Sequence, residues 1–145
     1  MTTLEIVGRS DWDAKPPKRV DYINKVVPYV VIHHSYSPAA CSTSAKCKAA
    51  MRSMQDFHQN DRKWNDIGYR WVRLRVFRTN RKFPEIDFLF FFSFAIGGDG
   101  AVYEGRGFNV VGAHAPNYND KSIGICLIGD WQGLCYHSNA KRHVI

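Results

Sequence analysis

Two adjacent histidines, His33 and His34, follow the apolar run Tyr29–Ile32 and could bind a metal ion through imidazole nitrogen. The run has too little polarity for a half-exposed strand, so it predicts a strand buried on both faces that stops near Pro38. Successive side chains of a strand point to opposite faces, so only one histidine needs to face a cleft. An ordinary pair of histidines, hydrogen-bonded at a strand end, is the alternative interpretation.

An amphipathic helix of about four turns is predicted after the histidines. Ser42 or Thr43 can cap it. Small or apolar residues then recur at intervals of three and four: Cys47, Ala50, Met51, Met54, Phe57 and His58. We expect the methionines to pack in the core rather than to serve a metal or cofactor. A compact turn, RKWNDIGY, follows the helix and contains Trp64 and Tyr69.

Further strands are predicted in the second half of the chain. Phe94–Ile96 and Ala101–Tyr103 flank a Gly-Gly-Asp-Gly turn, which indicates a β-hairpin. The segment Ser122–Trp131 is another apolar strand, and Trp71–Phe77 alternates apolar residues with arginines as a strand does. The glycines lack the strand-to-helix setting of a phosphate-binding loop, so a nucleotide site receives little weight.

Four cysteines are present, and two of them flank the short polar segment CSTSAKC. A local disulfide between Cys41 and Cys47 is the first expectation, but the same spacing suits two reduced cysteines. Cys126 lies in an apolar strand pattern and Cys135 near the end of the chain. None of these spacings is that of a zinc knuckle.

The composition, 45% hydrophobic and 23% charged, predicts one globular domain with its own core. A net charge of +7 permits nucleic acid, anionic lipid or bacterial envelope polymers as partners. The segment Arg70–Phe92 contributes six basic and two acidic residues, which is +4 of that charge. It lacks a base-stacking platform, so no nucleic-acid partner is expected. No membrane-spanning run and no signal-peptide pattern are present, which predicts a soluble chain without an export signal.

Several segments together resemble animal peptidoglycan recognition proteins, most of all the insect members: IHHS, CSTSAKC, FHQNDRKWNDIGY and GGDGAVYEGRGFNVVGAHAPNYNDKSIGICLIGDW. The match covers about Leu4–Tyr69 and Ser93–Gln132. The resemblance implies an α/β fold in which helices flank a mixed central β-sheet, related to zinc amidases, with a groove for muramyl peptide. Catalytic members cleave the amide bond between N-acetylmuramic acid and L-alanine. Others only bind peptidoglycan and signal in innate immunity.

The resemblance also assigns roles to single residues. His33 corresponds to a zinc ligand, Tyr69 to the catalytic tyrosine beside the metal, and Cys41 and Cys47 to the family disulfide. The positions that line the peptide groove are His34, Ser35, His58, Arg62, Trp64, Arg106 and His114.

The pair Trp64 and Arg106 resembles the one that favours stem peptides of the diaminopimelic-acid type. A guanidinium can hold the extra carboxylate of such a stem in a fork. Lys63 stands where such members usually have glycine. We therefore expect bacterial peptidoglycan or muramyl peptides as partners, with diaminopimelic-acid stems favoured by this pair.

Two parts depart from the family pattern. A further histidine and a cysteine should ligate zinc after the last strand, but Cys135, His137 and His143 differ from that pattern in order and spacing. We therefore expect a domain over residues 4–132 with an insertion at 70–92, a non-family tail at 133–145, and the C-terminal part of the fold missing. The run FLFFFS in the insertion resembles a translated pyrimidine-rich tract before a splice acceptor, so a retained intron is the first interpretation. A genuine surface loop is the alternative, since the entropy of loop closure grows slowly with length.

Three functions follow in order of preference. The first is peptidoglycan recognition by a zinc-dependent N-acetylmuramoyl-L-alanine amidase domain, whose activity is uncertain because the zinc ligands are incomplete. The second is a receptor or scavenger that binds peptidoglycan without cleaving it, and the third is a basic binder of nucleic acid or membranes. The resemblance and its disulfide predict a secreted protein, whereas the lack of a signal peptide leaves the cytoplasm as the alternative.

Overall fold

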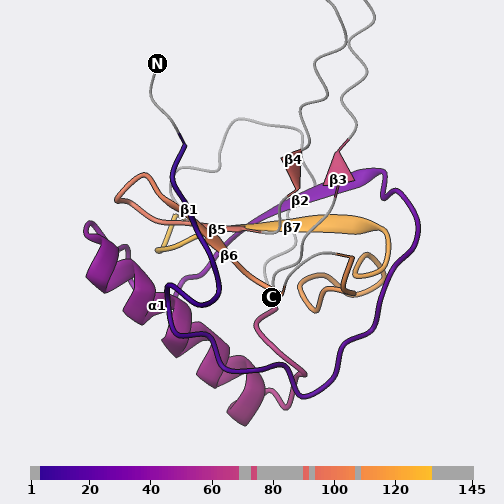
Figure 1. The fold of residues 1–145 in the computed structure, drawn as a ribbon, viewed down its shortest axis with the longest axis horizontal. Helices are drawn as coiled ribbons and strands as arrows, with labels where there is room; N and C mark the ends of the chain where they lie inside the picture. The colour runs from indigo at the N-terminus through magenta and orange to yellow at the C-terminus, as the bar shows by residue number, and fades with distance from the viewer. Residues whose placement is uncertain (1–3, 69–72, 75–89, 92–93, 107–108, 132–145) are drawn as a thin grey trace, which may run out of the picture.

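The computed structural model describes residues 4–68, 73–74, 90–91, 94–106 and 109–131 (Figure 1). Five strands form one sheet in the order β1-β6-β5-β7-β2. The strands β5 and β6 are antiparallel, and the other neighbours are parallel, so the sheet is mixed as predicted. Their bounds are Ile6–Val7 for β1, Tyr29–His34 for β2, Phe94–Ile96 for β5, Val102–Glu104 for β6 and Ser122–Leu127 for β7.

The predicted amphipathic helix is α1, Ser44–Asp56, and it continues into a π-helical turn, η1, at Phe57–Asp61. Thr43 caps it, because its hydroxyl oxygen accepts the N–H of Lys46 at 3.4 Å. Figure 1 shows α1 lying along one side of the sheet. The helix residues Cys47, Ala50, Met51 and Met54 are buried in one core cluster with residues of the sheet strands. The prediction that these methionines pack in the core is confirmed.

A disulfide joins Cys41 to Cys47, and the predicted hairpin packs directly against it. The hairpin strands β5 and β6 pair from Phe94 with Glu104 to Ile96 with Val102. A Cβ on Gly98 would lie 2.4 Å from the carbonyl oxygen of Cys41, and Gly100 has a φ of +85°. The turn therefore needs glycine at one position for close approach and at another for a left-handed backbone.

The prediction that the run Tyr29–Ile32 is buried on both faces is wrong. Strand β2 ends the described sheet and pairs only with β7 among the described strands. Tyr29, Val30 and Ile32 are 51%, 47% and 66% exposed. Hydrophobic patterning reports the residue types of a strand but not its place in the sheet order, so it did not distinguish an edge strand from a central one.

The predicted strand Trp71–Phe77 is confirmed at two residues, Arg73–Leu74, which form β3. It pairs antiparallel with β4, Phe90–Phe91, in a separate two-stranded sheet. The remainder of the predicted insertion and the predicted tail lie outside the described residues, so the domain boundaries stay a prediction.

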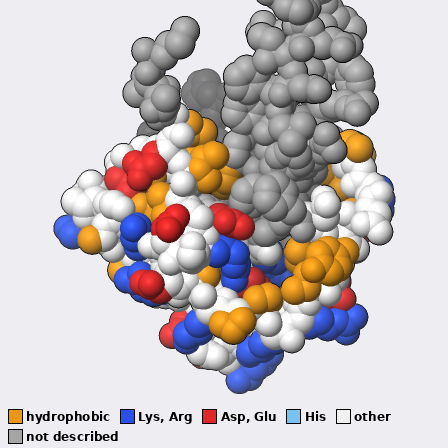
Figure 2. Space-filling model, in the orientation of Figure 1, with side chains coloured by type: hydrophobic (Ala, Val, Ile, Leu, Met, Phe, Trp, Pro, Cys, Tyr) orange, Lys and Arg blue, Asp and Glu red, His pale blue; other side chains and the backbone are white. Residues whose placement is uncertain are grey.

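Basic residues on the surface lie close to acidic ones in several places. The ion pairs Arg19–Asp21, Lys25–Asp120 and Arg52–Asp13 have N–O distances of 2.8, 3.3 and 3.1 Å. On the face shown in Figure 2, lysine and arginine side chains are interspersed with acidic and apolar ones. Nucleic-acid binders usually gather their positive charge on one face or stripe, whereas the charges on the described part of this face are mixed. Within the described residues, no helix is long and apolar enough to cross a bilayer.

Candidate functional site

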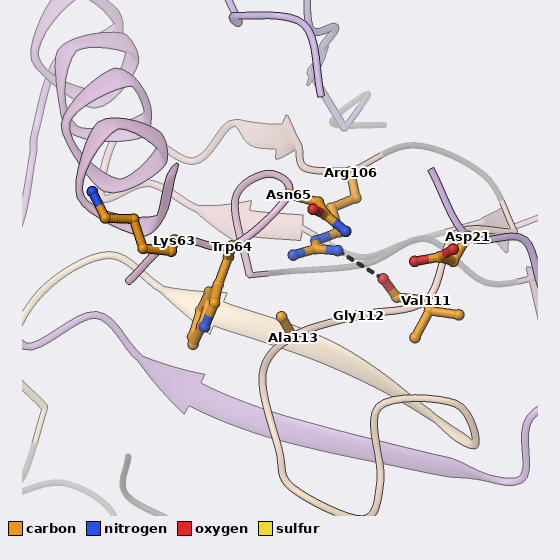
Figure 3. A pocket seen from close by; sticks show the side chains of 8 residues that line it. All are labelled: Asp21, Lys63, Trp64, Asn65, Arg106, Val111, Gly112 and Ala113. Atoms are coloured by element: carbon orange, nitrogen blue, oxygen red, sulfur yellow. Dashed lines mark hydrogen bonds between the residues drawn. The ribbon is translucent and has the colours of Figure 1, made fainter. Parts of the chain in front are cut away.

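An open pocket of about 270 Å³ lies between the turn after η1 and the loop after β6 (Figure 3). The turn brings residues 63–65, the loop brings Arg106 and residues 111–113, and Asp21 comes from the N-terminal segment. Gly68 allows the turn and the loop to approach, because a Cβ there would lie 2.9 Å from both the Ala113 carbonyl oxygen and the Trp64 ring. The lining residues are Asp21, Lys63, Trp64, Asn65, Arg106, Val111, Gly112 and Ala113.

The guanidinium of Arg106 is held by backbone carbonyls on both sides of the pocket. Its Nε donates to Ile67 O at 2.5 Å, its Nη1 to Val111 O at 3.0 Å and its Nη2 to Asp66 O at 3.2 Å. Burial lowers the pKa of Arg106, while the nearby Asp66 carboxylate acts in the opposite direction. An arginine stays charged in proteins, and its fork has more N–H donors than these bonds use. The site therefore presents an oriented positive charge.

His58 and Trp64 form a stacked pair beside this charge. Their ring centroids are 4.6 Å apart, and their planes are inclined by 17°. The N–H of Gly68 donates to His58 Nδ1 at 3.2 Å, so the neutral ring carries its proton on Nε2. Burial, and then the charges of Arg106 and Arg62, lower the pKa of His58 to about 4. His58 is therefore a neutral hydrogen-bonding group at neutral pH.

The two basic residues between His58 and Trp64 differ in their positions. Arg62 is exposed and lies over the Phe57 ring, 5.3 Å from its centroid, and it is not among the residues that line the pocket. Lys63 lines the pocket with a left-handed φ of +59°. In Figure 3 its side chain points away from Arg106. A left-handed backbone favours glycine, the residue that the resemblance implies for this position.

A second group of predicted residues lies at the end of β2. His33 Nε2 is 3.0 Å from His114 Nδ1, and the two rings meet edge to face. His114 is only 2% exposed, and a Cβ on Gly124 would lie 2.7 Å from its Cγ. The side-chain oxygen of Asn119 accepts the N–H groups of His114 and Ala115 at 2.7 and 2.9 Å. The structure thus brings His33 and His114 together in a tightly packed environment.

His34 and Ser35 bind the segment that follows β7. The N–H of Trp131 donates to His34 Nδ1 at 3.2 Å, and Asp130 Oδ1 is 3.6 Å from the same nitrogen. Ser35 Oγ accepts the N–H of Gly129 at 2.8 Å and donates to Pro38 O at 2.9 Å. These bonds connect the ends of the paired strands β2 and β7. The predicted contacts of His34 and Ser35 with a ligand stay predictions.

An ion pair between a partly exposed arginine and a buried carboxylate supports the pocket, and the sequence analysis missed it. Arg9 Nη2 lies 2.9 Å from Asp66 Oδ2, off the line of a hydrogen bond. Asp66 Oδ1 accepts Gln55 Nε2 at 2.6 Å and the N–H of Ile67 at 2.7 Å. The network joins the N-terminal segment and α1 to the turn that carries Trp64. In the sequence, the only local sign of this ion pair is Asp66, the acidic residue between Trp64 and Ile67. Its partner Arg9 lies far away along the chain.

A zinc site needs about three protein ligands and an open position for water. In the part of the chain that the structure describes, no group of three or more His, Cys, Asp or Glu residues could hold a metal ion. His33 is described, whereas Tyr69, Cys135, His137 and His143 lie outside the described residues. The described residues alone therefore do not fit a complete zinc site.

Residues 23–143 match the N-acetylmuramoyl-L-alanine amidase family. The chain belongs to this family. Among relatives, peptidoglycan-recognition protein LB of Drosophila melanogaster is 51% identical over 132 residues, which are 91% of this chain and 47% of the relative. The N-acetylmuramoyl-L-alanine amidase of Mus musculus is 40% identical over 106 residues, which are 72% of this chain and 16% of the relative. These matches confirm the predicted resemblance to insect-type peptidoglycan recognition proteins.

Solved structures of peptidoglycan recognition proteins share the fold. Wild-type Drosophila PGRP-LB superposes with a TM-score of 0.72 at 50% identity, over 90% of this chain and 64% of that one. PGRP-LE was solved in complex with tracheal cytotoxin, a monomeric diaminopimelic acid-type peptidoglycan. It superposes with a TM-score of 0.66 at 34% identity, over 86% of this chain and 59% of that one. The chain spans about half the length of the curated relatives that it matches, 47% and 56% of the first two. The family is generally zinc-dependent.

Proposed function

We propose that the chain binds muramyl peptide of the diaminopimelic-acid type in the pocket beside Trp64 and Arg106. The observation that carries this proposal is the Arg106 guanidinium, fixed by three backbone carbonyls at an open pocket. An oriented guanidinium with spare donors suits a carboxylate, and the Trp64 ring offers an apolar surface for the stem. In solved complexes, PGRP-LE and a mutant of PGRP-LB bind tracheal cytotoxin, and this likeness supports the choice of ligand.

The proposed activity is recognition with little amidase turnover by this chain. His33 would be the zinc ligand and Tyr69 the group that stabilises the transition state, as the family resemblance implies. A single histidine ligand holds zinc weakly, because metal affinity comes from several ligands fixed at once. The residues Cys135, His137 and His143 do not repeat the family's ligand pattern, so we expect no substitute site from them.

The Cys41–Cys47 disulfide supports an extracellular location for the protein. Disulfides persist in oxidising compartments and are rare in the cytosol. We therefore favour secretion over the cytoplasm for this protein.

Calorimetry with purified muramyl peptides tests the proposed binding. The wild-type chain should bind the diaminopimelic-acid stem more tightly than the lysine stem. Arg106→Lys should weaken binding of the diaminopimelic-acid stem about tenfold, because a lysine cannot offer a fork to the carboxylate. Arg52→Lys, on α1 and paired with Asp13 away from the pocket, is the matched control and should bind like wild type.

The absence of saturable binding to either peptide would contradict the proposal, as would equal effects of the two substitutions. Thermal unfolding of both variants ensures that a loss of binding reflects the pocket. Binding that collapses between low and moderate salt would instead indicate a nonspecific electrostatic binder, because phosphate-driven affinity falls steeply with salt.

A further inference from the structure

The pocket beside Trp64 is lined by an acidic residue as well as by the fixed guanidinium. Asp21 and Arg106 both line it, and in Figure 3 Asp21 lies on the side of Arg106 that is opposite Trp64. Val111 connects the two residues. Its N–H donates to Asp21 O at 2.7 Å, and its carbonyl oxygen accepts Arg106 Nη1 at 3.0 Å. The segments that carry the two charges are therefore bonded to each other beside the pocket.

Backbone contacts hold the segment around Asp21 against the loop after β6. Tyr22 forms an antiparallel bridge with Val110, and the N–H of Ile23 donates to Asn109 O at 2.5 Å. The side chains of Ile23 and Val110 are buried where the two segments meet. Asp21 thus has a defined position relative to the loop that carries Arg106.

The carboxylate of Asp21 keeps acceptor positions for a ligand. Arg19 Nε and Nη2 both lie 2.8 Å from the same oxygen, Oδ1, and the Asp21 side chain is 43% exposed. An ionised carboxylate has two oxygens with about four acceptor positions. Burial lowers the pKa of Arg106, whereas the carboxylates of Asp66 and Asp21 act in the opposite direction. The charges of Asp21 and Arg106 are thus close enough to influence each other.

A carboxylate and a guanidinium at one pocket match a ligand group that carries charges of both signs. The side chain of diaminopimelic acid ends in such a group, with an ammonium and a carboxylate on the same carbon atom. The proposed function assigns this carboxylate to Arg106. The neighbouring ammonium then needs an acceptor, and Asp21 is the only acidic residue among the described residues that line the pocket.

We propose that Asp21 binds the free ammonium group of the diaminopimelic-acid side chain while Arg106 binds the carboxylate beside it. This inference rests on the proposed function of the pocket and adds a second requirement to it, because the amine must be unmodified. A cross-link between two stem peptides acylates this amine, which removes its positive charge and places extra atoms next to Asp21. The chain therefore prefers stems whose diaminopimelic-acid amine is free over stems in which it is cross-linked.

Calorimetry with a matched pair of ligands tests the inference. One is a muramyl tetrapeptide with diaminopimelic acid at its third position, and the other is the same peptide acetylated at the free amine. The wild-type chain should bind the acetylated peptide at least about fivefold more weakly, which is the upper value for an ion pair at an exposed site. Asp21→Asn has nearly the same shape without the charge. It should bind the free-amine peptide about fivefold more weakly than wild type and should no longer distinguish the two peptides.

Asp13→Asn is the matched control, because it removes the same charge from an exposed ion pair with Arg52 away from the pocket. It should keep the wild-type ratio of the two affinities. A structural defect at the pocket would weaken both peptides alike, so the ratio isolates the contact with the amine.

Equal affinities of the wild type for the two peptides would overturn the inference, as would a wild-type ratio in Asp21→Asn. If Arg106→Lys weakens binding while Asp21→Asn behaves like wild type, the carboxylate site stands and the role of Asp21 is refuted. Failure of the wild type to bind either peptide would refute the proposed function and this inference with it.

Discussion

At the level of single residues, the positively charged guanidinium of Arg106 lies near His58, a histidine that is neutral at neutral pH. Arg106 is held by carbonyls from two segments, and its charge disfavours protonation of His58. Burial acts on His58 in the same direction and is the larger cause. The pair can therefore offer a ligand one cationic donor and one neutral ring over a wide range of pH.

The pKa of His58, about 4 against an ordinary value of 6.5, predicts a loss of stability in mild acid. Between these values the unfolded chain binds a proton that the folded chain does not, so stability falls as the pH falls from 6.5 towards 4. At roughly 1.4 kcal/mol per pKa unit, the loss is on the order of 3 kcal/mol. Denaturant unfolding at several pH values measures it.

His58→Asn is the control for this prediction, because its side-chain oxygen can still accept the Gly68 N–H but does not titrate. This part of the pH dependence should disappear in the variant. A histidine resonance of residue 58 that titrates near pH 6.5 in the folded protein would contradict the predicted shift.

The left-handed backbone of Lys63 predicts that replacing this residue with glycine stabilises the protein. A left-handed backbone costs a residue with a Cβ roughly 1–2 kcal/mol, and the greater freedom of glycine in the unfolded chain offsets about 0.4–1 kcal/mol. We expect Lys63→Gly to raise the free energy of unfolding by up to about 1.6 kcal/mol, whereas Lys63→Ala should not. Equal stability of the two variants in chemical denaturation would argue against this account of residue 63.

Short motifs let several of these residues be predicted from sequence. The histidine pair and the segment FHQNDRKWNDIGY place His33, His58 and Trp64 in recognisable local patterns. The bond between His33 and His114 and the pair of Arg9 with Asp66 join residues far apart in the chain. Such contacts depend on how the strands and turns pack, which periodicity does not report.

At the level of elements, helix α1 and the hairpin follow their sequence signals, and strand β2 does not. The helix has a cap and a regular apolar face, and the hairpin has turn glycines between strand residues. Both signals are local. The position of β2 at the end of the described sheet depends on which strands pair with it, so its apolar residues were wrongly assigned to the interior.

The exposure of β2 predicts that a charge is tolerated there. Ile32→Lys should change the free energy of unfolding by no more than about 0.5 kcal/mol, as expected for an exposed position. It should also reduce self-association in light scattering, since a charged residue protects an edge strand from pairing with another chain. Ile123→Lys, at a position 1% exposed on the paired strand β7, should unfold the domain. Comparable destabilisation by both substitutions would show that Ile32 is buried in solution.

At the level of the whole molecule, the insertion predicted at residues 70–92 separates two parts whose sequence motifs resemble the family. We expect deletion of Arg70–Phe92 to raise both soluble yield and the midpoint of thermal unfolding. The deletion removes the apolar run FLFFF, which is prone to aggregate when exposed, and it rejoins the turn to β5. A deletion variant with an equal or lower midpoint would show that the segment is an integral part of the fold.

The whole chain is proposed to bind muramyl peptide without efficient cleavage. Its described residues contain no group of three or more potential metal ligands, and the pocket beside Trp64 presents the Arg106 guanidinium. The most direct test is mass spectrometry of the bound and free fractions after the chain is incubated with zinc and a muramyl peptide that has a diaminopimelic-acid stem. We predict intact muramyl peptide in the protein-bound fraction. Steady accumulation of free stem peptide, lost in His33→Ala, would contradict the account and identify this chain as a working amidase.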